Sequence, residues 1–148
     1  MQEVGTFCLQ IGFSYLATVA FGICTNVPRR ALNACGLTGA AGWIVYWVLF
    51  QFHLGRMLPN LLGAFVIALV SLFFARRNKI PVIIFNIPGL VPLVPGGLAY
   101  QAVRAFVLGQ YLNGIQYAIQ VAMIAGALAI GFMLAQFVGN SRLLHWRR

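Results

Sequence analysis

The side chains best suited to binding chemistry lie on a short stretch in the second half of the 148-residue chain. Gly97, Tyr100, Gln101 and Arg104 are three or four residues apart, so a helix places them on one face. The planar guanidinium of Arg104 can bind a carboxylate or phosphate through two parallel hydrogen bonds. This face predicts a site for a small anion, which Tyr100 and Gln101 would orient.

Arg104 also has a structural interpretation. An arginine near the end of a membrane helix can extend its head group to the interface, or pair with a carbonyl or with the acid of a partner chain. The residue pattern alone leaves both interpretations open.

The segment that leads into this face, residues 80–97, is apolar but interrupted by prolines and glycines. Proline removes a backbone donor and clashes with the preceding helical turn. Residues 80–112 would measure roughly 50 Å as one α-helix, longer than the roughly 30 Å hydrocarbon core. We therefore predict a short helix at residues 81–87, an unwound stretch at residues 88–97 and a second helix from Leu98.

Irregular backbone inside a membrane is tolerated where it is buried in protein or lines a watery cavity, which is typical of transporter binding sites. The unwound stretch would offer free backbone groups and the positive end of the second helix. The predicted substrate-binding residues are therefore Asn86, Pro88, Gly89, Pro92, Pro95, Gly96, Gly97, Tyr100, Gln101 and Arg104.

Composition identifies the class of protein. Hydrophobic residues make up 61% of the chain and charged residues 7%, and the mean hydropathy is +0.90. Soluble domains carry roughly 25% charged residues. The sequence therefore predicts an all-α integral membrane protein, with residues 1–148 forming a single transmembrane domain in a lipid bilayer. The basic residues separate apolar segments, which favours a role in membrane orientation over nucleic-acid binding.

Five apolar segments follow one another, and the fourth is the interrupted one. They span about residues 4–24, 31–51, 57–75, 80–112 and 115–138, with the last loop expected around Asn113 and Gly114. Five crossings place eight of the ten basic residues in two loops and the tail on one side. The positive-inside rule then puts the N-terminus outside and the C-terminus in the cytoplasm. The alternative, a re-entrant fourth segment, would turn the basic tail outward.

Rows of small residues and the scarcity of acidic side chains suggest a partner subunit. Ala127, Gly131, Ala135 and Gly139 recur every four residues, beside a second row of Ala118, Ala122 and Gly126. Such rows permit close packing within the chain, against a second copy or against another subunit. Glu3 is the one carboxylate in the sequence. Proton coupling usually needs an acid or histidine within the membrane, so a partner would have to supply one.

Other kinds of site find little support. The sequence has no catalytic triad, clustered carboxylates, metal-ligand spacing or Walker-type phosphate loop, so we predict neither an enzyme nor a bound cofactor or metal. Cys8, Cys24 and Cys35 lie in apolar stretches and are interpreted as packing residues. His53 and His145 are assigned to a loop and to the tail.

Two motifs resemble a known family. Residues 26–31, Asn-Val-Pro-Arg-Arg-Ala, precede a glycine-rich helix that ends in Gly42 and Trp43, and residues 87–97 read Ile-Pro-Gly-Leu-Val-Pro-Leu-Val-Pro-Gly-Gly. Together they resemble the threonine/serine exporter family, and more specifically the small membrane subunit of its two-component form. A split relative is associated with succinate export.

The resemblance implies about five helices in a bacterial inner membrane and a larger partner subunit. It also implies export driven by the proton gradient, as in an antiporter. Our hypothesis is a transporter subunit that exports a small carboxylate-bearing metabolite: threonine, serine or a dicarboxylate such as succinate. The alternatives are a non-transporting scaffold that stabilises a partner transporter, and a passive channel.

Overall fold

The chain folds into helices joined by short connections. The computed structural model describes the backbone of residues 2–52 and 55–145 and the side chains of residues 5–52 and 55–139. These residues form α1 (Gln2–Cys24), α2 (Arg29–Gln51), α3 (Met57–Asn78), α4 (Ile83–Leu90), the 3-10 helix η1 (Val91–Leu93), α5 (Gly96–Val107) and α6 (Tyr111–His145). The predicted all-α class is confirmed. His53 and the side chains of Arg142, His145, Arg147 and Arg148 lie outside the described residues.

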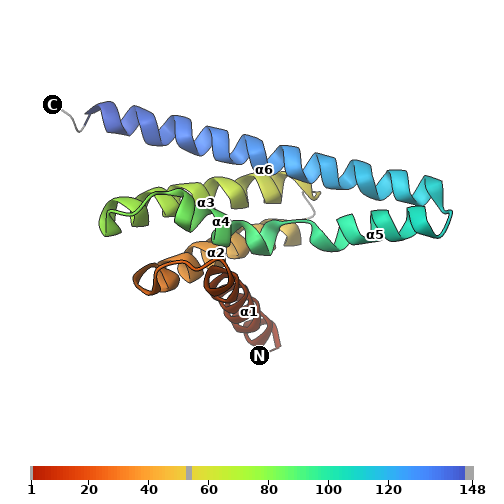
Figure 1. The fold of residues 1–148 in the computed structure, drawn as a ribbon, viewed down its shortest axis with the longest axis horizontal. Coiled ribbons are helices and arrows are strands. Elements are labelled where there is room, and N and C mark those ends of the chain that lie inside the picture. Colours follow the sequence, from red (N-terminus) through yellow and green to blue (C-terminus); the bar gives the residue numbers. More distant parts are fainter. Residues whose placement is uncertain (1, 53–54, 146–148) are drawn as a thin grey trace.

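Helices α1, α2, α3 and α6 and the bent pair α4–α5 pack into one helix bundle (Figure 1). Helices α1, α2, α3 and α6 are each long and apolar enough to span a membrane, and α4–η1 with α5, a pair bent by 58°, passes the same test and would make a fifth span. Ala31, Ala75, Ile80 and Phe85 pack together where α2 and α4 begin and α3 ends. We call this the basic end, because it carries Arg29, Arg30, Arg76, Arg77 and Lys79.

The position at which α6 ends tests the alternative in which residues 80–112 re-enter the membrane and return to the same side. Arg76 donates from Nη2 to the carbonyl oxygen of Gly139 at 3.5 Å, so α6 reaches the basic end at which α4 began. The bent segment therefore carries the chain across the bundle before α6 returns. This geometry supports five crossings. Which end faces the cytoplasm stays a prediction.

The break in the fourth span is confirmed, but it is shorter than predicted. Helix α4 runs through Pro88 and Gly89 to Leu90, η1 adds one turn, and Val94 and Pro95 alone separate it from α5. Two of the prolines occupy positions that need no helical donor: Pro92 is the second residue of η1, and Pro95 precedes the first residue of α5. The expected ten-residue unwound stretch is wrong for this reason.

The last loop also differs from the prediction. It lies at residues 108–110, where Gly109 has a φ of +74°, a left-handed conformation that glycine adopts without a Cβ penalty. Gly114, expected in the loop, is buried in the first turns of α6. A Cβ built there would lie 2.9 Å from the Phe106 ring, so Gly114 allows α5 to approach.

Close packing by small residues holds the bundle together. Gly36 packs against Tyr15 and Gly39 against Thr18, both on α1, while Gly42 lies against Ile67 on α3. On α6, the row containing Gly131 is buried, and a Cβ at Gly131 would meet the backbone carbonyl of Leu61. The second row, Ala118, Ala122 and Gly126, is exposed. The first row thus packs within the chain.

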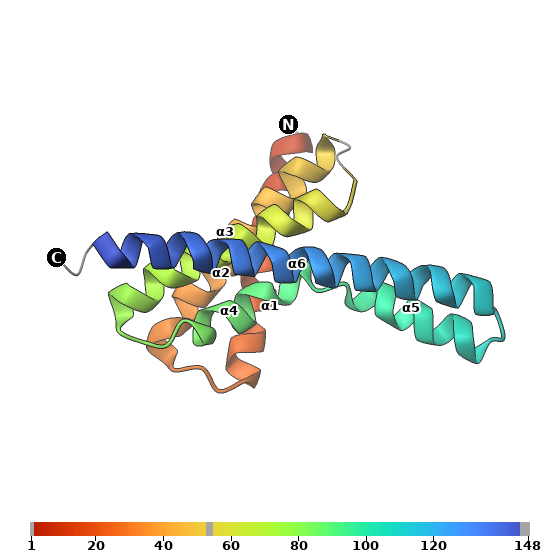
Figure 2. The ribbon, with the colours of Figure 1, turned by 90° about the horizontal axis from the view of Figure 1, so that it is seen from above.

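Helix α5 and the first turns of α6 form a hairpin that extends past the start of α3 (Figure 2). Arg56, just before α3, donates a hydrogen bond to Gln120 on α6. The roughly nine residues of α6 that precede Gln120 therefore extend beyond the start of α3. Leu93 packs over Gly63, about 9 Å along α3 from its first residue by helical rise. The break therefore lies in the half of the bundle away from the basic end.

We predict that Gly131→Val lowers the free energy of unfolding by about 1–3 kcal/mol, because the added side chain meets the backbone of α3, which cannot rotate away. Gly126→Val on the same helix is the matched control, since nothing lies within 4 Å of a Cβ there. Thermal unfolding of the purified proteins in detergent would compare them. Equal midpoints for the two variants would contradict the inferred α3–α6 contact.

Candidate functional site

The break lies beside a cavity of about 250 Å³. The non-helical Val94 and Pro95, with Pro92, Leu93 and Leu98, form one wall. The other walls come from three helices that are distant in sequence: α2, the start of α3 and the middle of α6. We call this space the break cavity; its remaining lining residues are Trp43, Tyr46, Phe50, Arg56, Asn60 and Ile124.

The bend that creates the cavity is set by local backbone geometry. The axes of the two halves, Ile83–Leu93 and Gly96–Val107, differ by 58°. Val94 is extended, with φ −63° and ψ 128°, and Pro95 follows with φ −77° and ψ 50°. The buried side chain of Leu93 anchors the turn in a cluster with Ala64 and Ile67. The break is thus held in one conformation by the core.

Aromatic rings from α2 form the wall opposite the break. The Trp43 and Tyr46 ring centroids lie 5.1 Å apart, and Tyr46 stacks on Phe50 at 5.8 Å. Trp43 also donates from Nε1 to Oε1 of Gln10 on α1 at 2.9 Å, which fixes its ring. These contacts give the cavity a rigid apolar side.

Two polar side chains complete the break cavity. Asn60 is 3% exposed and donates from Nδ2 to the backbone carbonyl of Arg56 at 2.6 Å. The Arg56 guanidinium is exposed and donates from Nη1 to Oε1 of Gln120 on α6 at 3.4 Å, a long contact that a stronger acceptor can replace. The cavity therefore combines a cation, a buried amide and aromatic rings.

A second recess lies farther along the hairpin. It measures about 340 Å³ and is lined by Gln101, Arg104, Ala105, Leu108, Gln110 and Tyr117. Arg104 follows Leu98, which lines the break cavity, by six residues, so it lies about 9 Å farther along α5. We call this the hairpin recess. It is more exposed than the break cavity because its polar side chains, Gln101, Arg104 and Gln110, face away from the bundle core.

The structure divides the predicted substrate-binding residues among separate places. Pro92 and Pro95 line the break cavity, and Gln101 and Arg104 line the hairpin recess. Gly96, Gly97 and Tyr100 are exposed, and Tyr100 is 69% accessible. Pro88 and Gly89 are buried, with Gly89 allowing contact with Thr38 on α2. The predicted residues therefore do not form one site by themselves.

Asn86 has an unusual environment on α4. Its side-chain oxygen Oδ1 is buried and has no hydrogen-bond partner among the described residues. An unpaired buried acceptor costs about 1–3 kcal/mol, so it is a position where water or a ligand donor would be favoured.

Sequence reasoning missed Arg56 and Asn60. Neither residue is near the proline–glycine stretch in sequence, and Arg56 lies in the short connection before the third apolar segment. One signal was available: Asn60 and Ser71 are polar residues within the apolar segment 57–75. Trp43, Tyr46 and Trp47 are residue types that suit a membrane interface; in the structure Trp43 and Tyr46, together with Phe50, line the cavity.

The sequence of this chain is similar to those of known proteins. A family model described as "Threonine/Serine exporter, ThrE" matches residues 10–138. An uncharacterised protein of Haemophilus influenzae is 24% identical over 126 residues, which cover 85% of this chain and 42% of the relative. No solved structure gives a significant match.

Two further relatives carry functional names. A threonine/serine exporter of Corynebacterium glutamicum is 27% identical over 84% of this chain and 25% of its own length. A probable threonine/serine exporter of Mycobacterium tuberculosis is 24% identical over 84% of this chain and 24% of its own length. The chain therefore spans less than half the length of these relatives. Because the family model covers most of the chain, the protein belongs to the threonine/serine exporter family.

Proposed function

We propose that this chain forms part of a secondary transporter that exports threonine, serine or a similar small carboxylate-bearing metabolite across the bacterial inner membrane. Family membership and the names of two relatives support the amino-acid class. The observation that carries the proposal is the break cavity, where a broken membrane span meets an arginine and a buried amide. Broken spans typically form transporter sites.

The break cavity suits a small amino acid in size and chemistry. Its volume of about 250 Å³ is several times what one water molecule needs, so a small metabolite fits. Arg56 would bind the carboxylate in place of Gln120, and Asn60 would hydrogen-bond a polar substituent. The rings of Trp43 and Tyr46 would favour the ammonium group through cation–π attraction.

Arg104 would provide a second contact along the path. In this proposal the substrate carboxylate passes between Arg56 and Arg104, with Gln101 orienting it in the hairpin recess. Gly96 and Gly97, at the start of α5, are exposed, and nothing lies within 4 Å of a Cβ built at either position. The unpaired oxygen of Asn86 would take a substrate or water donor on the other side of the break.

Coupling to the proton gradient would need a group from outside this chain. Glu3 is the one acid of the sequence, and intramembrane acids usually carry the proton in such transporters. The relatives are more than twice as long as the matched region, which supports a larger partner subunit that supplies the acid. A second copy of this chain is the other partner that we consider.

Efflux from proteoliposomes tests this function. We expect preloaded threonine or serine to leave vesicles that contain this chain together with the partner, and to leave faster when a proton gradient is imposed. Succinate in a parallel sample tests the dicarboxylate alternative. Equal flux from the partner alone would contradict the proposal in favour of a scaffold, and flux indifferent to the gradient would indicate a passive channel.

We predict that Arg56→Gln weakens the apparent affinity for the exported amino acid about 10- to 100-fold, because a charge-assisted hydrogen bond contributes about 1.5–3 kcal/mol. Arg56→Lys should recover part of this loss, since it restores the charge without the planar fork. Arg29→Gln, at the basic end, is the charge-matched control. Unchanged KM in Arg56→Gln vesicles would remove Arg56 from the site.

Arg104→Gln is expected to abolish export while leaving the amount of assembled protein in the membrane unchanged, because Arg104 is exposed and makes no core contact. Efflux and size-exclusion chromatography of the same preparation would separate the two effects. Normal transport by this variant would rule out an essential charge on α5, and loss of assembly would indicate a structural role.

A further inference from the structure

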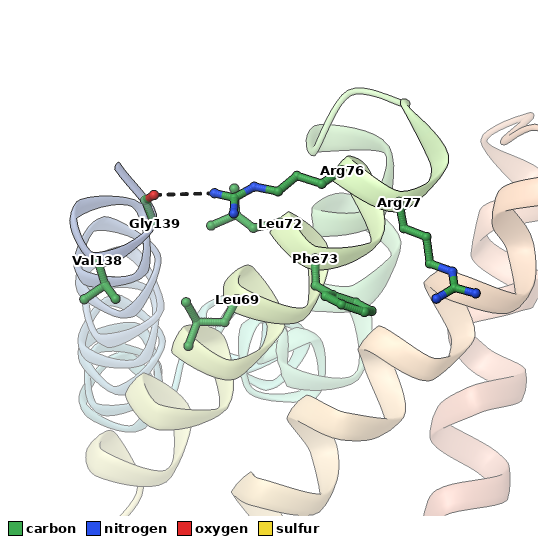
Figure 3. Close-up of a pocket in the computed structure, with 7 residues that line it drawn as sticks. All are labelled: Leu69, Leu72, Phe73, Arg76, Arg77, Val138 and Gly139. Atoms are coloured by element: carbon green, nitrogen blue, oxygen red, sulfur yellow. Dashed lines mark hydrogen bonds between the residues drawn. The ribbon is translucent and has the colours of Figure 1, made fainter. Parts of the chain in front are cut away.

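A large groove lies at the basic end, away from both sites described above. Figure 3 shows it between the last turns of α3 and the matching region of α6. Its volume is about 820 Å³, more than three times that of the break cavity. Leu69, Leu72, Phe73 and Val138 form its apolar walls, and Arg76 and Arg77 lie at one end, where Arg76 reaches toward Gly139 and Arg77 points to the other side of α3 (Figure 3). We call it the basic-end groove.

The order of these residues along α3 makes the groove amphipathic. Leu69 precedes Arg76 by seven residues, so the apolar wall begins about 10 Å deeper along α3 than the charge. Phe73, between them, is 59% exposed. A ligand in this groove would contact apolar side chains along most of its length and the two arginines at one end. A phospholipid has an apolar chain and an anionic head group in this arrangement, whereas a small water-soluble anion has no apolar chain.

The two arginines are available to an external anion. Arg76 makes one long hydrogen bond, to the Gly139 carbonyl, and Arg77 has no hydrogen bond or ion pair among the described residues. The single acid of the sequence, Glu3, lies toward the other end of the bundle, because Phe7 on the same helix packs against Trp47 near the end of α2. No carboxylate of this chain is therefore placed to neutralise the pair.

We propose that the basic-end groove binds one anionic phospholipid. Its phosphate would accept hydrogen bonds from Arg76, with the positive charge of Arg77 at the next position of α3, and one acyl chain would lie along Leu69, Leu72 and Val138. Arginine forks match phosphate geometry, and basic pockets between membrane helices are suited to anionic head groups. The bound lipid would fill a space that α3 and α6 leave open and would connect their ends. This inference does not depend on which substrate is transported.

Native mass spectrometry of the purified full chain tests this inference. The protein would be titrated with phosphatidylglycerol and with phosphatidylcholine of identical acyl chains. We expect one phosphatidylglycerol to bind about 10- to 30-fold more tightly, which corresponds to roughly fivefold for each arginine near an anionic lipid. Equal affinity for the two lipids would overturn the proposal.

Matched variants separate a built site from general surface charge. Arg76→Gln with Arg77→Gln should lower the phosphatidylglycerol affinity to that of phosphatidylcholine, whereas Arg29→Gln with Arg30→Gln removes the same charge at the same end and should leave it unchanged. Arg77→Gln alone preserves the Arg76–Gly139 contact, so it tests the charge without altering the helix contact. Equal losses in the two double variants would indicate unspecific attraction and overturn the groove assignment.

Two further measurements examine the lipid tail. Val138→Phe keeps both arginines but fills part of the groove, and it should weaken phosphatidylglycerol binding several-fold. Inorganic phosphate at the same concentration should not compete measurably, because it lacks the acyl chain. Efficient competition by phosphate, together with full binding by Val138→Phe, would assign the arginines to a free anion and contradict a lipid site.

Discussion

The structure depends on one constraint: a helix interrupted within a membrane must satisfy its backbone donors without water. The interrupted span, α4 to α5, satisfies this constraint in two ways. Pro88, Pro92 and Pro95 have no N–H to satisfy, and the amides of Val94 and Gly96 donate locally to the carbonyls of Leu90 and Val94 at 3.2 and 2.8 Å. Helices α2, α3 and α6 cover the break. Because the donors are satisfied locally, the neighbouring side chains are free to form a cavity.

Close helix packing makes that cover possible. Gly42 and Gly63 bring the backbones of α2 and α3 together, and Leu93 fits into the space that Gly63 leaves. Because Gly42 and Gly63 have no side chains, the bent span can pack closely against α2 and α3. The polar residues Arg56 and Asn60 then lie next to Pro92 and Pro95. The packing of small residues therefore determines which polar groups face the break.

The arrangement separates three kinds of surface along the bundle. The hairpin recess contains Arg104, the break cavity contains Arg56, and the basic-end groove contains Arg76 and Arg77. The arginine sites differ in size and in the residues beside the charge: Arg56 lies beside aromatic rings and a buried amide in about 250 Å³, and Arg76 and Arg77 lie beside leucines in about 820 Å³. A small carboxylate suits the smaller break cavity, and a lipid head group suits the wide groove at the end of the helices.

Local sequence features determined the fold class, the number of passes and the presence of a break. Hydropathy and basic loops report on each segment by itself, and proline restricts its own backbone and that of its neighbour, so these features need no knowledge of tertiary contacts. The extent of the break was overestimated because a proline near a helix start costs little, as Pro92 and Pro95 show.

The membership of the candidate site was decided by tertiary structure. Arg56 and Asn60 lie more than thirty residues before Pro92 in the sequence, and the aromatic wall lies earlier still. No local pattern specifies that α2, α3 and α6 meet the break at these positions, because that register results from the mutual fit of glycines and large side chains across the core. The sequence identified where the backbone is irregular, and the packing decided which charge faces it.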